Sequence, residues 1–455
     1  MTTHDRALPL PKFRSVPAEF PADAMAAYSD HWVSNVHSRV GFLETLHDTL
    51  GLTPKVDFNA GVVAAGEAQI ESTVTGNAVP EQRDVGEGDA MAMGREEVLK
   101  DQRQVFLPIN NALSEVGHVH GFLQEIGQGI QHVASRVDDL IGFVQRGNDY
   151  RKITGEGFTF LNIPRSYYGV LSLSSLPCSL SPSTSQTILT ACENFILTPD
   201  GAVPLHLTRR DVERQLQESL GVNSIANNEL VDHKEDILDA IMKSRYENMY
   251  TLLGDHLTEE QYMGIVRNQI LVDVQGDDLL FQIFTSPILQ QNANDEAPFF
   301  EFIQRVCSSS SPNERQKMKP GCGGFGIRNF LTLFLSIEVS KAMHNLAAAK
   351  KQQNPPNERD VAFFSRMVEL FTSQLNESNP ILTEISNAMT DEGEAEEKIA
   401  ESGEGVEMSI WKDRMDGARR RKEQGNSDLM RCSEKYKLKM RALRKEREAE
   451  LCKGS

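Results

Sequence analysis

The sequence lacks several features that would place it in a well-defined class of proteins. Its six cysteines are scattered and none forms a Cys-x-x-Cys pair, which argues against a structural zinc site and fits a reducing compartment. No apolar run approaches the roughly 18 residues that a membrane span needs. The first residues do not show a charged segment followed by a hydrophobic one, so we expect no secretory signal. We therefore expect a cytoplasmic protein that does not associate with membranes.

Positive charge is also scarce. The chain has 47 Lys and Arg against 65 Asp and Glu, a net charge of -18 at pH 7. Because binding to phosphate groups needs a basic surface, we do not expect a nucleic-acid partner. The length of 455 residues suggests roughly two to four domains. The content of 39% hydrophobic and 25% charged residues indicates a globular protein in which some segments are unpacked.

Changes in pattern divide the chain into five predicted parts. Residues 1–25 form an extended lead-in. Over 26–168 the predicted order of elements is a strand, a helix and three strands. This order starts at His31 and begins again near Ile130. A further strand is predicted over Phe158–Pro164. Residues 169–245 interrupt this order and are interpreted as a helical insertion, after which 246–349 resume it. Residues 350–455 are charge-dense and predicted to be helical or disordered, as a solvated helix or a partner-binding arm.

Two short buried strands are predicted around residues 280–305, joined by a polar loop over Gln290–Glu296. Alternation places Gln282 and Phe284 on one face, and Phe299 and Glu301 on one face of the partner strand. A buried carboxylate without a partner is costly, so Glu301 should be paired, protonated or metal-bound. The simpler alternative is an edge strand with Glu301 facing water, since glutamate is seldom fully buried.

Three residues are candidate metal ligands: His31 and His132, near the starts of the two repeats, and Glu301. Two imidazoles and one carboxylate on three strands can hold divalent iron and leave positions open for a chelating substrate and dioxygen. Each residue also has an ordinary structural interpretation. A lone histidine is more often a core or surface residue than a metal ligand, and the chain has 11 histidines.

Several longer stretches strengthen this interpretation, and through them the chain resembles a known family. The resemblance is to the C-terminal, catalytic half of the 4-hydroxyphenylpyruvate dioxygenases, of the vicinal-oxygen-chelate superfamily, and it covers roughly residues 8–168 and 246–345. The stretches that carry it are Asp30-His31 with Ser34-Asn35-Val36, Leu107–Asn110, Gly129–Ala134, Leu280–Thr285, Phe300–Arg305, and Gly321–Gly326 with Asn329-Phe330.

The resemblance implies an α+β fold in which paired βαβββ modules form a half-open mixed β-barrel around a metal site. It implies that His31, His132 and Glu301 bind Fe(II). It further implies conversion of 4-hydroxyphenylpyruvate and O2 to homogentisate and CO2, in tyrosine catabolism. The implied partners are thus a small aromatic 2-oxo acid and O2, and the tail adds a possible homo-oligomer or protein partner. The implied catalytic residues are Gln282, Gln131, Asn110 and Ser72, and the implied substrate pocket and helical lid contain Phe284, Phe299, Phe325, Asn329 and Phe330.

The chain also departs from the family's pattern. By this resemblance its first residues correspond almost to the start of the catalytic half, so we expect no counterpart of the family's structural N-terminal domain in this sequence. It also carries the insertion and the charged tail. His118 stands where the family has a pocket glutamine. Two alternatives therefore stay open: a hydroxymandelate synthase-like oxygenase with the same ligands, and a catalytically silent paralogue that acts as a protein-interaction module. Convergence of the three candidate ligands would favour an enzyme.

Overall fold

The protein is described by a computed structural model that covers residues 27–58, 63–76, 105–198, 201–220, 229, 231–275, 278–286, 295–306, 326–351, 358–401 and 406–454. The predicted lead-in over 1–25 therefore lies outside the described residues. Within them, no helix is both long and apolar enough to cross a membrane.

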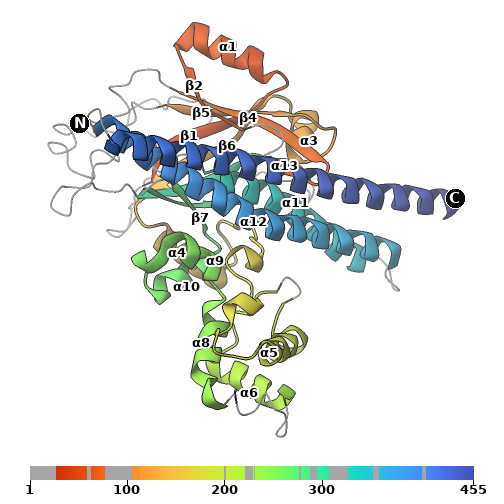
Figure 1. Cartoon of the computed structure of the whole chain (residues 1–455). Coiled ribbons are helices and arrows are strands. Elements are labelled where there is room, and N and C mark those ends of the chain that lie inside the picture. Colours follow the sequence, from red (N-terminus) through yellow and green to blue (C-terminus); the bar gives the residue numbers. More distant parts are fainter. Residues whose placement is uncertain are drawn as a thin grey trace, which may run out of the picture.

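The centre of the molecule is a mixed sheet that comprises nine strands in the described residues (Figure 1). The strand order is β2-β4-β5-β1-β6-β9-β8-β7, with the short β3 paired to β4. The strands are β1 (Ala27–Asn35), β2 (Thr53–Phe58), β3 (Ala64–Ala65), β4 (Ala68–Gly76), β5 (Phe106–Ala112), β6 (Gly129–Val137), β7 (Leu271–Gln275), β8 (Asp278–Phe284) and β9 (Phe299–Val306).

The sheet contains the same unit twice. The first is β1, α1 (Arg39–Leu50), β2, β4 and β5, and the second is β6, α4 (Leu140–Thr154), β7, β8 and β9. In each unit the first strand pairs in parallel with the last, and β1 and β6 join the two units as antiparallel neighbours. This arrangement confirms the predicted α+β fold with paired βαβββ modules and a half-open mixed sheet.

Alternating burial explains which face of the central strands turns inward. His31 and Val33 on β1 are buried, whereas Trp32 between them is 47% exposed. Successive side chains of a strand point to opposite faces, so one face of β1 belongs to the interior and the other lies at the surface. The candidate ligands on this strand and its neighbours are on the interior face.

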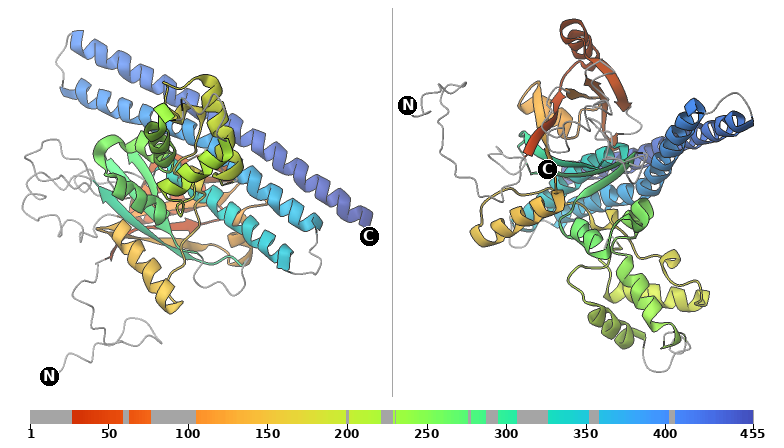
Figure 2. Two further views of the ribbon diagram at one scale, coloured as in Figure 1. Left: turned by 90° about the horizontal axis from the view of Figure 1, so that it is seen from below. Right: turned by 90° about the vertical axis from the view of Figure 1, so that its left-hand side faces the viewer.

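Three helices follow the sheet in the sequence and pack against one side of it (Figures 1 and 2): α11 (Ile327–Lys351), α12 (Glu358–Glu401) and α13 (Val406–Gly454). Phe371, Leu375 and Leu382 of α12, with Leu429 and Met440 of α13, belong to the same hydrophobic core as the sheet. The prediction of a merely solvated tail is therefore wrong, because apolar residues at helical spacing give each helix a face to bury.

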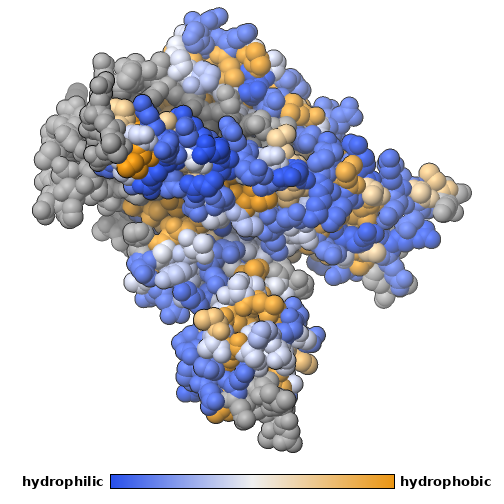
Figure 3. All heavy atoms as spheres, in the orientation of Figure 1, coloured by the Kyte–Doolittle hydropathy of each residue, from blue (hydrophilic) through white to orange (hydrophobic). Residues whose placement is uncertain are grey.

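The charges of this helical hairpin lie on its outer surface. Arg421 pairs with Asp391, and Lys435 Nζ lies 2.5 Å from Glu377 Oε2, so both pairs join α12 to α13. Figure 3 shows mainly hydrophilic residues over the outward surface of these helices. The charge-dense composition that suggested a separate arm thus belongs to the solvent side of a packed hairpin.

The insertion forms a hydrophobic cluster of its own and projects from the end of the molecule opposite α1 (Figures 1 and 2). Ile188, Val212 and Ile237 lie in this cluster, one on each of its helices. These helices are α5 (Pro182–Phe195), α6 (Arg209–Leu220) and α8 (Lys234–Lys243). The boundaries of the five predicted parts stay a prediction.

Residues around the insertion connect it to the sheet. The strand predicted over Phe158–Pro164 is wrong: only Phe160 forms a bridge, to Thr285, and the segment then enters the short helix η2 (Arg165–Tyr167). Proline has no backbone N–H to donate to a sheet ladder, which limits pairing at Pro164. The other helices in the described part of the chain are α3 (His118–Glu125), α9 (Glu247–Leu253) and α10 (Glu259–Arg267), with the short η3 (Leu173–Ser175) and η4 (Gly254–His256).

Candidate metal centre

The structure brings His31, His132 and Glu301 together from three adjacent strands. His31 on β1 is level with Ala134 on β6, and Ala134 is level with Glu301 on β9, so the small alanine separates two ligand candidates in one row. His132 lies two residues along β6. Glu301 Oε2 is 3.1 Å from His31 Nε2 and 3.3 Å from His132 Nε2. All three side chains are buried, with one ligand atom of each within 4.8 Å of the others.

Glu301 is 1% exposed, and β9 lies between β6 and β8 rather than at an edge. The edge-strand alternative is therefore wrong. Pairing of Phe284 with Glu301 across β8 and β9 places both side chains on the interior face, as alternation predicts.

A buried ion pair between Asp30 and Arg305 orients the His31 ring through its Nδ1 atom. Asp30 Oδ1 lies 2.8 Å from His31 Nδ1, and Arg305 donates to both Asp30 oxygens at 2.8 and 2.9 Å. A carboxylate that accepts from Nδ1 leaves Nε2 as the ligating nitrogen, the usual arrangement behind a metal-bound histidine. His132 Nδ1 has a comparable neighbour in Gln131 Oε1, at 3.1 Å.

A chain of hydrogen bonds holds Glu301 and connects it to α11. Gln282 donates to Glu301 Oε1 at 2.6 Å, and Asn329 donates to Gln282 Oε1 at 2.5 Å. The Tyr167 hydroxyl is 3.2 Å from Asn329 Oδ1 and also accepts from the Val272 N–H at 2.9 Å. Oε1 of Glu301 is thereby occupied, which directs Oε2 toward the two imidazoles.

Mutual charge stabilisation explains how a carboxylate is tolerated at this depth. Burial raises the pKa of Glu301, but His31 and His132 outweigh it and lower the pKa to about 2. Burial lowers the pKa of His31, yet Glu301 and Asp30 raise it to about 9. Burial lowers the pKa of His132. Without a metal, the site at neutral pH therefore contains an ionised Glu301, a protonated His31 and a neutral His132.

A small chamber of about 30 Å³ adjoins the three residues. Ser72, Gln282, Phe284, Asn329 and Phe330, all predicted site residues, line it together with the two histidines and Glu301. Ser72 Oγ is buried and has no hydrogen-bond partner among the described residues. A buried hydroxyl in that state is a free donor and acceptor for a bound molecule.

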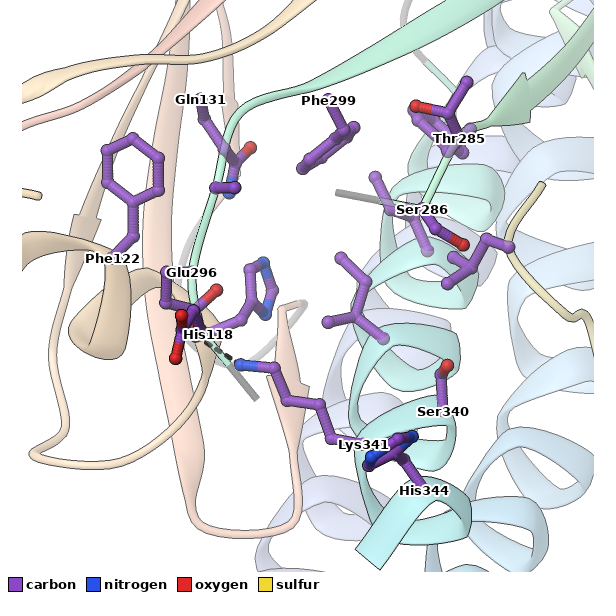
Figure 4. A pocket seen from close by; sticks show the side chains of 16 residues that line it. His118, Phe122, Gln131, Thr285, Ser286, Glu296, Phe299, Ser340, Lys341 and His344 are labelled. Atoms are coloured by element: carbon purple, nitrogen blue, oxygen red, sulfur yellow. Dashed lines mark hydrogen bonds and ion pairs between the residues drawn. The ribbon is translucent and has the colours of Figure 1, made fainter. Parts of the chain in front are cut away.

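The other predicted site residues lie elsewhere. Gln131 and Phe299 line a second, larger cavity of about 310 Å³ (Figure 4). Asn110 faces neither cavity and donates to Asn35 Oδ1 at 3.2 Å, while its own Oδ1 has no partner in the described part of the chain. Phe325 lies outside the described residues.

Several residues of this region were missed by sequence reasoning. Asp30 stands beside His31 and was a visible signal, but nothing in the sequence shows that Arg305 reaches it from β9. Tyr167 is likewise joined to Asn329, 162 residues away. Glu296 and Lys341, which form an ion pair in the second cavity, have no motif to mark them.

Comparison with known proteins points to one family. No protein-family model matches the chain. The 4-hydroxyphenylpyruvate dioxygenase of Hordeum vulgare is 38% identical over 104 residues, which are 23% of this chain and 23% of that protein. The enzyme of the same name from Arabidopsis thaliana is 27% identical over 242 residues, 51% of this chain and 49% of that protein. The chain thus spans about a quarter to a half of the length of these relatives.

Among solved structures, a mutant of 4-hydroxymandelate synthase from Streptomyces coelicolor is 15% identical, with a TM-score of 0.34. The match covers 69% of this chain and 53% of that protein's chain. A fusion of a xylose isomerase-like barrel with a 4-hydroxyphenylpyruvate dioxygenase is 14% identical, with a TM-score of 0.28, and covers 63% and 27%. These structural similarities are low, and the assignment rests on the sequence matches. Over part of its length, the chain is a relative of the 4-hydroxyphenylpyruvate dioxygenases, in the vicinal-oxygen-chelate superfamily.

Proposed function

We propose that the chain is a non-haem iron(II) dioxygenase that converts 4-hydroxyphenylpyruvate and O2 to homogentisate and CO2, a step of tyrosine catabolism. The observation that carries the proposal is the convergence of two imidazoles and one carboxylate in a buried site of a chain related to such enzymes. Two histidines and one carboxylate are the typical ligands of oxygenases that keep open positions on iron(II).

The donor set fits a single ion. Ligand atoms that lie about 2.1 Å from one ion, at right angles to each other, are about 3 Å apart. The separations of Glu301 Oε2 from His31 Nε2 and His132 Nε2, 3.1 and 3.3 Å, are close to this value. Asp30 and Gln131 occupy the opposite ring nitrogens, so both Nε2 atoms are directed to the shared point. These residues would hold the ion.

Bound iron(II) would supply a centre that a 2-oxo acid chelates and the redox chemistry by which O2 is activated. The protein's own contributions are binding and exclusion of water. Gln282 and Asn329 fix Glu301. Phe284 and Phe330 cover the chamber with apolar surface, which keeps water from the reacting groups. Ser72 Oγ is available to hydrogen-bond a polar group of the substrate.

Anaerobic loading of the full chain with iron(II), followed by 4-hydroxyphenylpyruvate, tests the proposal. We expect a visible charge-transfer band between the 2-oxo acid and iron, absent in Glu301→Ala and retained in a control, Glu260→Ala, whose side chain is exposed on α10. Admitting O2 should then yield homogentisate. Formation of 4-hydroxymandelate would instead assign a hydroxymandelate synthase-like reaction, and failure to bind iron would refute the enzyme proposal.

A further inference from the structure

Two cavities share Phe284 and Leu333 as lining residues. The chamber beside the candidate ligands, about 30 Å³, has room for about one water molecule. The second cavity, about 310 Å³, is within the usual range of ligand pockets, about 300–1,000 Å³. A substrate that places its chelating end at the ligands therefore needs the second cavity for the rest of its structure.

The second cavity changes in character along its length. Toward the metal site it is aromatic: Phe299 stacks on the His132 ring with centroids 4.8 Å apart, and the Phe284 ring meets His132 edge-on at 5.9 Å. Away from it, Lys341 and His344 of α11 reach into the space, and Glu296 faces them from the segment before β9 (Figure 4). An aromatic ring would pack at the first end and meet polar groups at the second.

The polar end contains carboxylates together with Lys341 and two histidines, His118 and His344. Lys341 Nζ is paired with Glu296 Oε1, so its charge is already balanced. Asp295 also lines the cavity. Glu338 does not line it, but accepts a hydrogen bond from the backbone N–H of the lining residue His118 at 2.9 Å. A hydroxyl group on a ligand would find a hydrogen-bond acceptor among these carboxylates.

Glu296 is well placed to be that acceptor. Its Oε1 is held by Lys341, and its backbone N–H donates to Glu125 Oε2 at 2.8 Å, which fixes the residue on both sides. Burial raises the pKa of the Glu296 carboxyl, although Lys341 opposes the shift. A buried carboxylate is stabilised by each further donor that it gains.

We propose that Glu296, positioned by Lys341, selects the substrate by accepting a hydrogen bond from a hydroxyl group at the far end of its aromatic ring. This inference rests on the proposed function for the placement of the chelating end at the metal. It names a specificity residue outside the metal site, and it predicts discrimination against rings whose far end lacks an O–H donor.

The first test is a titration of the iron(II)-loaded full chain under anaerobic conditions, followed by the charge-transfer band. The ligands are 4-hydroxyphenylpyruvate, phenylpyruvate and 4-methoxyphenylpyruvate, which share one chelating end. A hydrogen bond to a charged acceptor corresponds to a preference of about tenfold or more for the hydroxyl compound. Glu296→Ala should reduce this preference to about twofold or less, whereas Glu260→Ala should preserve it.

A second test needs no iron and separates the two proposals. Ligand-observed NMR measures binding of 4-methylphenol and 4-methylanisole, probes of the cavity without a chelating end, to the full chain and to Glu296→Ala and Glu296→Gln. Preference for the phenol, lost in Glu296→Ala, supports the inference even if no 2-oxo acid gives a band, a result that would overturn only the proposed function. Equal binding of the two probes, or a preference that survives Glu296→Ala in a folded protein, overturns the inference.

Discussion

Replacing Asp30 by asparagine is expected to weaken the fold and the metal site together. The side chains of Asp30 and Arg305 are only 4% and 3% exposed and are joined by two hydrogen bonds. Burial raises the pKa of Asp30, but Arg305 outweighs it and holds the pKa far below its usual range. Removing one partner of a buried ion pair leaves the other uncompensated, which costs about 3–5 kcal/mol. We expect Asp30→Asn to lower the free energy of unfolding by that amount.

The effect on the metal has a separate origin. Asp30 Oδ1 lies 2.8 Å from His31 Nδ1, and loss of such a partner typically lowers metal affinity by about 10–100-fold. Urea denaturation of the metal-free chain measures the first effect, and competition with a chelator of known affinity measures the second. Asp149→Asn, at an exposed ion pair on α4, is the control and should change neither.

A double variant distinguishes the two effects. Asp30→Asn with Arg305→Met removes the uncompensated charge, so it should recover part of the stability but none of the iron affinity. If the free energy of unfolding of Asp30→Asn is within about 0.5 kcal/mol of that of the unmodified chain, the range of ordinary surface substitutions, the buried ion pair does not stabilise the fold as expected. If the iron affinity falls by less than about twofold, His31 is oriented without Asp30.

Four further outcomes follow from the structure. Iron(II) loading at pH 7 should release close to one proton, because Glu301 and Asp30, against burial, raise the pKa of His31 to about 9 and a ligating imidazole must be neutral. Calorimetry in buffers of different ionisation enthalpy measures this proton release. The release should vanish above about pH 9. If no proton is released at pH 7, His31 is not a protonated residue that becomes an iron ligand. For the metal-free chain the same raised pKa contributes stability fully below about 6.5, and this contribution is lost as pH rises through 9. Leu375→Ala, at a residue of α12 that is 0% exposed, should cost about 2–5 kcal/mol in urea denaturation. Leu438→Ala, at a residue of α13 that is 55% exposed, should cost far less, and equal effects would contradict the packed tail. Ile188→Ala, in the separate core of the insertion, should destabilise the insertion by a similar amount. We expect faster hydrogen exchange that is confined to 171–241, with unchanged iron affinity. A loss of iron affinity would contradict a core of the insertion that is independent of the sheet.

The candidate site shows how far local patterns reach. Alternation along β8 and β9 placed Gln282, Phe284 and Glu301 on one face, and the register confirms this face. The same pattern did not reveal whether Glu301 meets water, because that depends on the strand that lies beside β9. Its neighbour β6 begins 170 residues before β9 and pairs with it in parallel, a contact without a local signal.

The tail shows the opposite limit. Its charge density predicted a solvated helix, and its outer surface is indeed charged, yet Phe371 and Leu375 reach the main core. Composition averages over both faces of a helix, so a charge-dense helix with one apolar face is easily mistaken for one that stands alone. Contacts with α11, with the sheet and between α12 and α13 decide that the face is buried.

The sequence by itself determined the repeated order of strands and helices, which side chains of β8 and of β9 share a face, and the chemical identity of the candidate ligands. These depend on residue type and on periods of two or about 3.6 residues, which are local properties of the chain. The tertiary structure alone decided that His31, His132 and Glu301 converge, that Arg305 supports Asp30, and that two cavities share Phe284 as a lining residue. Such contacts join residues up to 275 positions apart, and their geometry depends on how strands pair and helices pack.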